Sequence, residues 1–241
     1  MPVGLLGKKL GQTRVYDAKG VSTPVTVVLA GPNHVLQCKT QQTDGYSAVQ
    51  LGFDEQKEHR LTQPLLGHLK KFNLQGGAVK RIKEFRNFSK EVKAGEVVGA
   101  TLFAPGDYVD AIGTTKGRGF EGVVGRHAFR GGDATHGAKG WHRRSGAIGQ
   151  RLFPGTVMRG MKMPGHMGQD TRTTQNLQVI QVRASENLLL IKGSIPGAEG
   201  DYVVIREAKK RPQGWKPPVV AISKKDAKKA ADASKKAEAK K

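Results

Sequence analysis

The residues of this chain that could do chemistry gather in one stretch of 36, positions 134–169, which contains no aspartate or glutamate. Exposed protein surfaces normally mix both signs of charge. An acid-free stretch of this length therefore indicates a uniformly negative partner. Lysine and arginine neutralise phosphates, and glycine lets backbone N–H groups approach them closely. The cations of the stretch are Lys139, Arg143, Arg144, Arg151, Arg159 and Lys162.

Aromatic side chains are interleaved with these cations. His136, His142 and His166 add hydrogen-bond donors or stacking rings, and Trp141 and Phe153 could stack on exposed bases. The competing interpretation is a flexible, solvated loop. Glycine-rich linkers seldom contain Trp, Phe, Met and Ile so regularly, so the pattern favours contact with folded nucleic acid.

Motifs that carry enzyme chemistry are missing from the sequence. Residues 117–122 match the dinucleotide fingerprint G-x-G-x-x-G, but that motif needs a βαβ unit and an acid about twenty positions on, and Asp133 comes too early. No Walker loop, Gly-x-Ser-x-Gly, Cys-x-x-Cys or His-Glu-x-x-His occurs. The sequence therefore predicts no cofactor, no metal site, no small-molecule substrate and no catalytic residue.

Charge is the strongest signal in the composition. The 241 residues include 41 Lys and Arg against 20 Asp and Glu, a formal net charge of +21. Such an excess indicates a polyanionic partner, nucleic acid first and an anionic membrane second. No apolar run approaches the roughly eighteen residues of a membrane span, so a membrane is not expected as a partner.

The cellular location is expected to be the cytoplasm, with an organellar matrix as the alternative. The first residues lack the apolar core of a signal peptide, because Lys8 and Lys9 follow a very short apolar stretch. Cys38 is the one cysteine, so no disulfide can form within the chain, which fits a reducing compartment. Its alternation with polar neighbours predicts a small buried side chain on a strand.

The elements that must position the basic stretch have a β-pattern. Short strands are predicted at 12–16, 21–30, 34–40 and 46–53, with Gly, Pro and Asp between them. This spacing is typical of a barrel or sandwich. Pro24 predicts an edge or a bulge in the second strand.

The middle of the chain changes character twice. A helix at 62–72 and a strand at 79–88 with basic residues on one face predict a small α+β insertion over 54–95. A strand follows at 108–112. From 113 to 168 no periodicity remains, and 15 of these 56 residues are glycine. A structureless stretch of this length is either disordered or an extension that a partner orders.

Strands predicted at 175–183, 188–192 and 202–206 return the chain to a β-pattern. Strands on both sides of the irregular stretch indicate an extension looped out of one β-domain. Residues 224–241 are rich in Lys and Ala without an apolar face, which predicts a basic tail that is disordered or marginally helical.

Several ordered motifs are similar to one known family. The sequence GLLGKKLGQT at 4–13 resembles the start of the universal large-subunit ribosomal protein that is third in the L series, in its bacterial or organellar form. The same family is indicated by 113–122, 133–137, 146–150, 154–168 and 187–193. Together these motifs span roughly residues 3 to 206.

The resemblance implies a translation-factor-like β-barrel. On this interpretation 1–112 is the first part of the barrel with the insertion at 54–95, 113–170 is a loop that threads through rRNA, and 171–207 completes the barrel. Residues 208–241, a basic tail expected to be disordered, have no counterpart in the family. It also implies a structural constituent of the large ribosomal subunit, without enzymatic activity, that acts early in assembly. Its partners would be large-subunit rRNA and neighbouring ribosomal proteins, with the loop near the peptidyl transferase centre.

The predicted RNA contacts are the basic and aromatic residues of the extension, a family-motif glutamine, and two lysines from the barrel. They are Lys8, Lys9, Lys116, Arg118, Arg126, Arg130, His136, Lys139, Trp141, His142, Arg143, Arg144, Gln150, Arg151, Arg159, Lys162 and His166.

Two other function classes fit the sequence less well. An RNA-modifying or isomerase-like enzyme on a β-barrel would need a cofactor cradle or a polar catalytic cluster, and the sequence offers neither. A sequence-neutral DNA-compacting protein would carry its basic residues on helices or β-arms that suit a duplex groove. Glycine-rich irregular chain instead suits threading through folded RNA.

Overall fold

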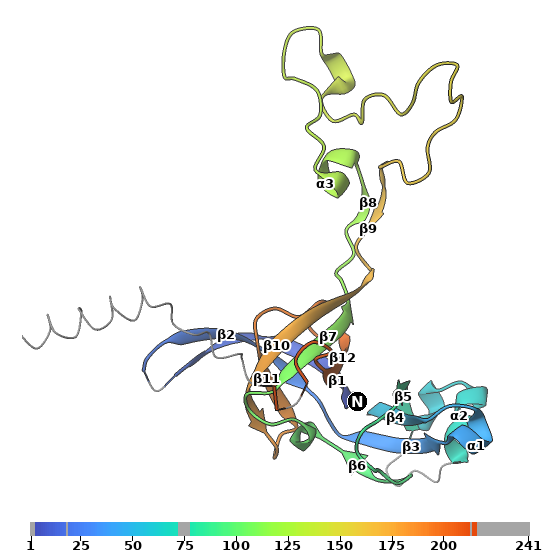
Figure 1. The fold of residues 1–241 in the computed structure, drawn as a ribbon, viewed down its shortest axis with the longest axis vertical. Coiled ribbons are helices and arrows are strands. Elements are labelled where there is room, and N and C mark those ends of the chain that lie inside the picture. The colour runs from blue at the N-terminus through green and yellow to red at the C-terminus, as the bar shows by residue number, and fades with distance from the viewer. Residues whose placement is uncertain (1–2, 18, 72–77, 213, 216–241) are drawn as a thin grey trace, which may run out of the picture.

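The computed structural model describes residues 3–17, 19–71, 78–212 and 214–215 (Figure 1). The predicted tail at 224–241 and the last residue of the predicted helix at 62–72 lie outside the described residues. The fold is mainly β, which confirms the predicted class.

Six antiparallel strands close into a barrel in the order β1-β12-β7-β10-β11-β2. Strands from both ends of the sequence are needed to close it, as expected for a β-domain that the extension interrupts. Their bounds are β1 Gly4–Tyr16, β2 Ser22–Leu29, β7 Tyr108–Thr114, β10 Thr171–Arg183, β11 Leu188–Lys192 and β12 Tyr202–Glu207.

Alternating apolar side chains fill the barrel interior. In β12, Val203 and Ile205 are fully buried while their neighbours are partly exposed, the period-two pattern of a strand with one face inward. The sequence predicted β1 only from residue 12, because glycine and lysine dominate its first half. Gly7 is required there, since a Cβ would lie 2.8 Å from the carbonyl oxygen of Leu29 in the neighbouring strand.

A second sheet has the strand order β5-β4-β3-β6. This sheet begins before the predicted start of the insertion at 54–95, because β3 and β4, the first two strands after the β1–β2 hairpin, belong to it and not to the barrel. Their alternation resembles that of barrel strands, and only long-range pairing separates them. The strands are β3 Asn33–Lys39, β4 Ala48–Gln56, β5 Ala78–Arg86 and β6 Val97–Val98.

The second sheet is covered on both faces. One face shares the barrel core through Leu51, Phe53 and Phe85. On the other face, Leu69 of α2 (Gln63–Lys70) packs with Val79. This double coverage explains the nearly continuous apolar run in β4. The remaining short helices outside the extension are α1 Gln41–Asp44 and the 3-10 turns Glu58–Arg60 and Ala100–Leu102.

Two local predictions can be compared with the structure. The β2–β11 ladder ends with Val25 opposite Lys192, and Pro24 lies one position beyond that pair. Proline has no N–H, and at this position none is required to pair with β11. Cys38 is exposed, which contradicts the predicted burial; its Sγ lies 3.2 Å from the carbonyl oxygen of Val92. The register of β3 against β4 shifts between Val35 and Gln37, which interrupts the strand alternation just before Cys38.

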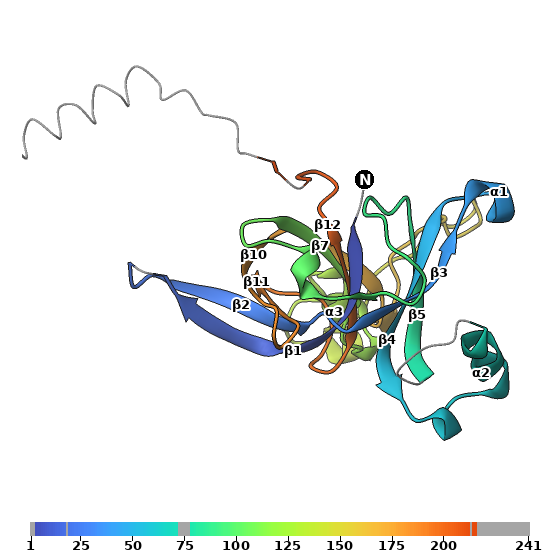
Figure 2. The same cartoon turned by 90° about the horizontal axis from the view of Figure 1, so that it is seen from below.

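The extension stands away from the barrel as a separate arm (Figure 1; Figure 2 gives the view from below). It contains a two-stranded ribbon, β8 Gly119–Glu121 with β9 Gly165–Met167, the helix α3 Val123–His127 and a 3-10 turn Lys139–Trp141. The prediction of a structureless stretch was therefore wrong for these elements. Each is five residues or fewer, too short to give a periodic signal in the sequence.

Candidate nucleic-acid interface

The extension begins as a continuation of two paired barrel strands. Thr114 of β7 is opposite Thr171 of β10, and beyond them the Thr115 N–H donates to the carbonyl of Asp170 at 2.9 Å. The Arg118 N–H then donates to the carbonyl of Met167 at 2.9 Å, just before the β8–β9 ribbon begins. A hydrogen-bonded stalk therefore connects the arm to the barrel.

Glycine is required at position 168, where the outgoing and returning segments of the stalk lie closest together. Gly168 has a φ of +79°, and a Cβ there would lie 2.2 Å from the carbonyl oxygen of Lys116. No L side chain fits so close a backbone contact, and the left-handed conformation independently favours glycine.

Arg126 and His127 both contact the carbonyl of Met163, and we call this set of contacts the latch. Arg126 Nη1 donates to the carbonyl of Met163 at 2.8 Å, and His127 Nε2 lies 3.1 Å from the same oxygen. Gly165 makes room for it, because a Cβ there would lie 2.6 Å from Arg126 Nη1. The half-buried Arg126 thus joins α3 to the returning chain, and we assign it a structural role instead of the predicted surface contact.

The tip of the arm, by which we mean the part around Trp141 and Arg144, presents an indole ring with a guanidinium beside it. Trp141 is 55% exposed, and the Arg144 Cζ lies 4.7 Å from the centroid of its ring. The backbone behind them is tightly packed: the Gly132 N–H donates to the carbonyl of His142 at 3.1 Å, and a Cβ on Gly131 would lie 2.3 Å from that oxygen. Two pockets of about 380 and 330 Å³ share the walls Trp141 and Arg144.

Large apolar side chains are exposed along the arm. Exposed apolar side chains gathered on one segment are typical of binding surfaces. Val123 is the arm's one contribution to the buried apolar core of the described residues. The exposed set is Phe120, Trp141, Ile148, Leu152, Phe153, Val157, Met158 and Met161.

The charges of the arm are almost all unpaired. Within the described part of the extension, the one ion pair joins Arg130 Nη2 to Asp133 Oδ1 at 2.9 Å, and both side chains are highly exposed. Exposed pairs of this kind contribute little. Apart from Arg126, which is held by Met163, the other cations of the arm have no ion-pair partner among the described residues.

Fourteen of the seventeen predicted contact residues are exposed. The structure places them all on the arm, where the regular secondary structure is limited to the β8–β9 ribbon, α3 and one 3-10 turn. They are Lys116, Arg118, Arg130, His136, Lys139, Trp141, His142, Arg143, Arg144, Gln150, Arg151, Arg159, Lys162 and His166.

The two predicted barrel lysines have different environments. Lys9 is buried, and its Nζ donates to the carbonyls of Ile195 and Gly197 at 2.9 and 2.8 Å. Burial, followed by repulsion from Lys116, lowers the pKa of Lys9. This lysine supports the loop between β11 and β12, and we leave it out of the proposed surface. Lys8 is half-buried, with its Nζ 5.9 Å from the ring centroid of Tyr202.

Two cations from the second sheet, which the sequence did not single out, join Lys8 at that ring. The Lys80 Nζ and Arg81 Cζ lie 5.6 and 4.7 Å from the Tyr202 centroid. The Tyr202 hydroxyl donates to Asp54, and burial and then this hydrogen bond raise the tyrosine pKa. The basic face predicted for the strand at 79–88 was the available signal, but its position beside the stalk depends on the barrel.

The described residues offer neither a metal-binding group nor a membrane-spanning helix. Across residues 3–17, 19–71, 78–212 and 214–215, no three His, Cys, Asp or Glu side chains are grouped to hold a metal ion. Within those same ranges, every helix is too short or too polar to cross a membrane.

Sequence comparison places the chain among known proteins. The family model described as Ribosomal protein L3 matches residues 53–188. Large ribosomal subunit protein uL3 of Deinococcus radiodurans is 50% identical over 208 residues, which cover 86% of this chain and 95% of that protein. The proteins of the same name from Akkermansia muciniphila and Pseudomonas fluorescens are 47% and 46% identical, covering 88% and 87% of this chain and 100% and 99% of theirs.

These matches run through the barrel, the second sheet and the extension. They agree with the family that the sequence motifs resemble, and a family of ribosomal proteins fits the prediction that the chain is not an enzyme. The chain belongs to the ribosomal protein L3 family.

Proposed function

We propose that this chain, a structural constituent of the large ribosomal subunit, binds large-subunit rRNA through its extension. The barrel and second sheet dock on the particle, and the arm threads between RNA segments toward the peptidyl transferase centre. The chain supports early assembly there and contacts neighbouring ribosomal proteins. Its location is the cytoplasm, bound to the ribosome.

One observation carries this proposal: the arm is exposed, cationic and aromatic at once. Its unpaired Lys and Arg side chains suit phosphates, and the exposed rings suit unstacked bases. Fixing the arm in one conformation costs conformational entropy, and burial of Val123 alone is too small a gain to offset that cost. RNA that surrounds the arm would supply the missing contacts, and the membership of the chain in a ribosomal family supports RNA as that partner.

The proposal is tested by reconstitution. Large-subunit particles lacking the chain are assembled with the intact protein or with a variant in which residues 138–152 are replaced by a short Gly-Ser linker. We expect the variant to sediment with early particles, since its barrel is unchanged, but to give few mature, active subunits. Particles that mature normally with the variant would contradict a role for the arm.

A further inference from the structure

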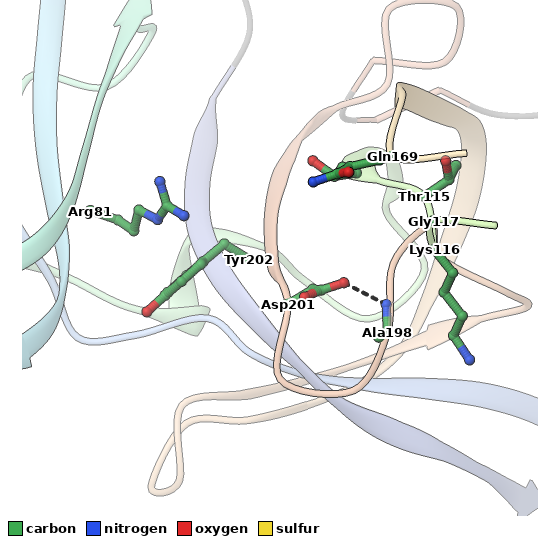
Figure 3. Close-up of a pocket in the computed structure, with 9 residues that line it drawn as sticks. Arg81, Thr115, Lys116, Gly117, Gln169, Ala198, Asp201 and Tyr202 are labelled. Carbon is green, nitrogen blue, oxygen red and sulfur yellow. Dashed lines mark hydrogen bonds between the residues drawn. The ribbon is translucent and has the colours of Figure 1, made fainter. Parts of the chain in front are cut away.

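A pocket of about 550 Å³ opens where the extension leaves the barrel, facing the edge of the second sheet (Figure 3). Its walls come from three parts of the fold: Arg81 of β5, Tyr202 of β12, and the stalk residues Thr115 and Gln169. The volume falls within the roughly 300 to 1,000 Å³ of ordinary small-ligand sites. No residue of this pocket except Lys116 was predicted from the sequence as a contact.

One wall of the pocket is cationic. Arg81 lies against the Tyr202 ring, and Lys8 and Lys80 approach the same ring. Three positive charges at one ring repel each other, and the Asp54 carboxylate, which accepts the tyrosine hydroxyl, balances only one of them. Among the described residues, neither Lys8 nor Arg81 forms an ion pair. The planar guanidinium of Arg81 is suited to a phosphate group.

The opposite wall carries an amide and a carboxylate. Gln169 has a φ of +55° and directly follows Gly168, which is also left-handed. Glutamine is uncommon in this region of φ, and side chains kept at strained backbone positions often have a functional task. In Figure 3 the Gln169 side chain extends into the pocket, and Asp201 is fixed in the wall by the Ala198 N–H, 2.6 Å from its Oδ2.

We propose that this pocket binds one unpaired nucleotide of RNA. Its phosphate lies at Arg81, and its base edge is hydrogen-bonded by Gln169 and Asp201. An amide and a carboxylate can match the donors and acceptors of a base, whereas a bare polyphosphate would be repelled by Asp201. The identity of the partner, RNA, rests on the proposed function. The pocket adds a second contact point, which lies where the arm leaves the barrel and not at its tip.

The test uses the full chain, labelled with ¹⁵N, and a single-stranded RNA octamer. We expect the octamer to shift the amide signals of Gly117, Gln169 and Tyr202, besides signals from the tip. Gln169→Gly should lose the shifts at the pocket and bind several-fold more weakly. Its melting temperature should not fall, because glycine accepts the left-handed conformation.

A charge variant tests the phosphate contact. Arg81→Gln should lower the slope of log affinity against log salt by about 0.7, the value for one phosphate contact on a single strand. Lys83→Gln is the matched control, because it removes the same charge from an exposed position of the same strand. We expect Lys83→Gln to keep the parental slope.

Three outcomes would overturn the proposal. If the octamer shifts only signals from the tip, the pocket is not an RNA site, although the proposed function stands. If no signal responds, the proposed function fails with it. If a hexaglutamate peptide shifts the pocket signals more strongly than the RNA does, the pocket binds acidic protein segments and the nucleotide assignment is wrong.

Discussion

Arg144 holds its guanidinium carbon 4.7 Å from the centroid of the exposed Trp141 ring, at the tip of an arm that contains almost no buried core. A stacked indole and guanidinium form a flat, cationic platform. Such a platform suits an unstacked base with its phosphate. We therefore propose that the tip, around Trp141 and Arg144, is the part of the arm that meets an unstacked base.

The first prediction concerns Trp141. We expect Trp141→Ala to weaken binding to large-subunit rRNA by about 1 to 3 kcal/mol, the usual effect of losing one base–aromatic stack. The melting temperature should stay unchanged, because the ring is 55% exposed and lies outside the core. Filter binding at fixed salt measures the affinity, and calorimetry measures the melting temperature.

A fluorescence experiment gives an independent check of that prediction. The chain has two tryptophans, so Trp215→Phe leaves Trp141 as the one indole. RNA that stacks on this ring should quench its emission. Unchanged emission together with tight binding would show that the ring does not meet a base.

The second prediction concerns the latch between Arg126 and Met163. Arg126→Ala removes a charged hydrogen bond of 2.8 Å from the middle of the arm. Hydrogen bonds of charged donors contribute roughly 1.5 to 3 kcal/mol. We expect amide exchange in residues 123–129 and 163–167 to become about tenfold faster, while the barrel stays protected. Equal exchange in the parent and the variant would mean that the latch does not order the arm in solution.

The third prediction concerns a buried carboxylate of the barrel. Asp110 is 1% exposed; it accepts from the backbone N–H groups of Asn176 and Lys209 and lies 3.5 Å from Arg206 Nη2. Removing one partner of a buried pair costs about 3 to 5 kcal/mol, and the lower end applies because Arg206 is one-third exposed. Urea unfolding should show Asp110→Ala to be about 3 kcal/mol less stable, and Asp110→Asn less affected. A loss below 1 kcal/mol for the alanine variant would contradict this role.

The fourth prediction concerns pH and the second sheet. Hydrogen bonds from Lys39, at 2.7 Å, and then from Tyr46 lower the pKa of Glu84 below its ordinary 4.5. The stabilisation is therefore present above pH 4.5 and is lost as the pH falls through the lowered pKa. We expect Glu84→Gln to have a shallower fall in melting temperature between pH 5 and pH 3 than the parent. Identical slopes would show that this network does not contribute.

The arm could be predicted from the sequence because its signal is compositional. An acid-free run with interleaved rings does not depend on which strand pairs with which. The short elements α3, β8 and β9 could not be predicted, since three to five residues give no periodicity. The hydrogen bond of Arg126 could not be predicted for a different reason: its acceptor, the Met163 carbonyl, lies 37 residues away in the sequence.

Lys8 and Lys9 show where sequence reasoning fails for the barrel. The two lysines are adjacent and look equivalent, yet Lys9 donates to carbonyls of Ile195 and Gly197 near the other end of the chain. Only the closed barrel brings those carbonyls to it. The assignment of β3 and β4 to a separate sheet likewise depends on pairing with β5, which local alternation does not encode.

We propose that the cations of the arm, and not merely the net charge, bind rRNA. Its most direct test is the salt dependence of binding for two variants that lose four positive charges each. One carries Gln in place of four cations of the arm: Lys139, Arg143, Arg144 and Arg151. The control carries Gln in place of four exposed lysines outside it: Lys57, Lys83, Lys90 and Lys93.

Each phosphate contact contributes about 0.7 to 0.9 to the slope of log affinity against log salt. The arm variant should therefore lower the slope by about 3, and the control should stay within about 1 of the parent. Equal slopes for the two variants would contradict the account, because they would show that any four charges serve equally well.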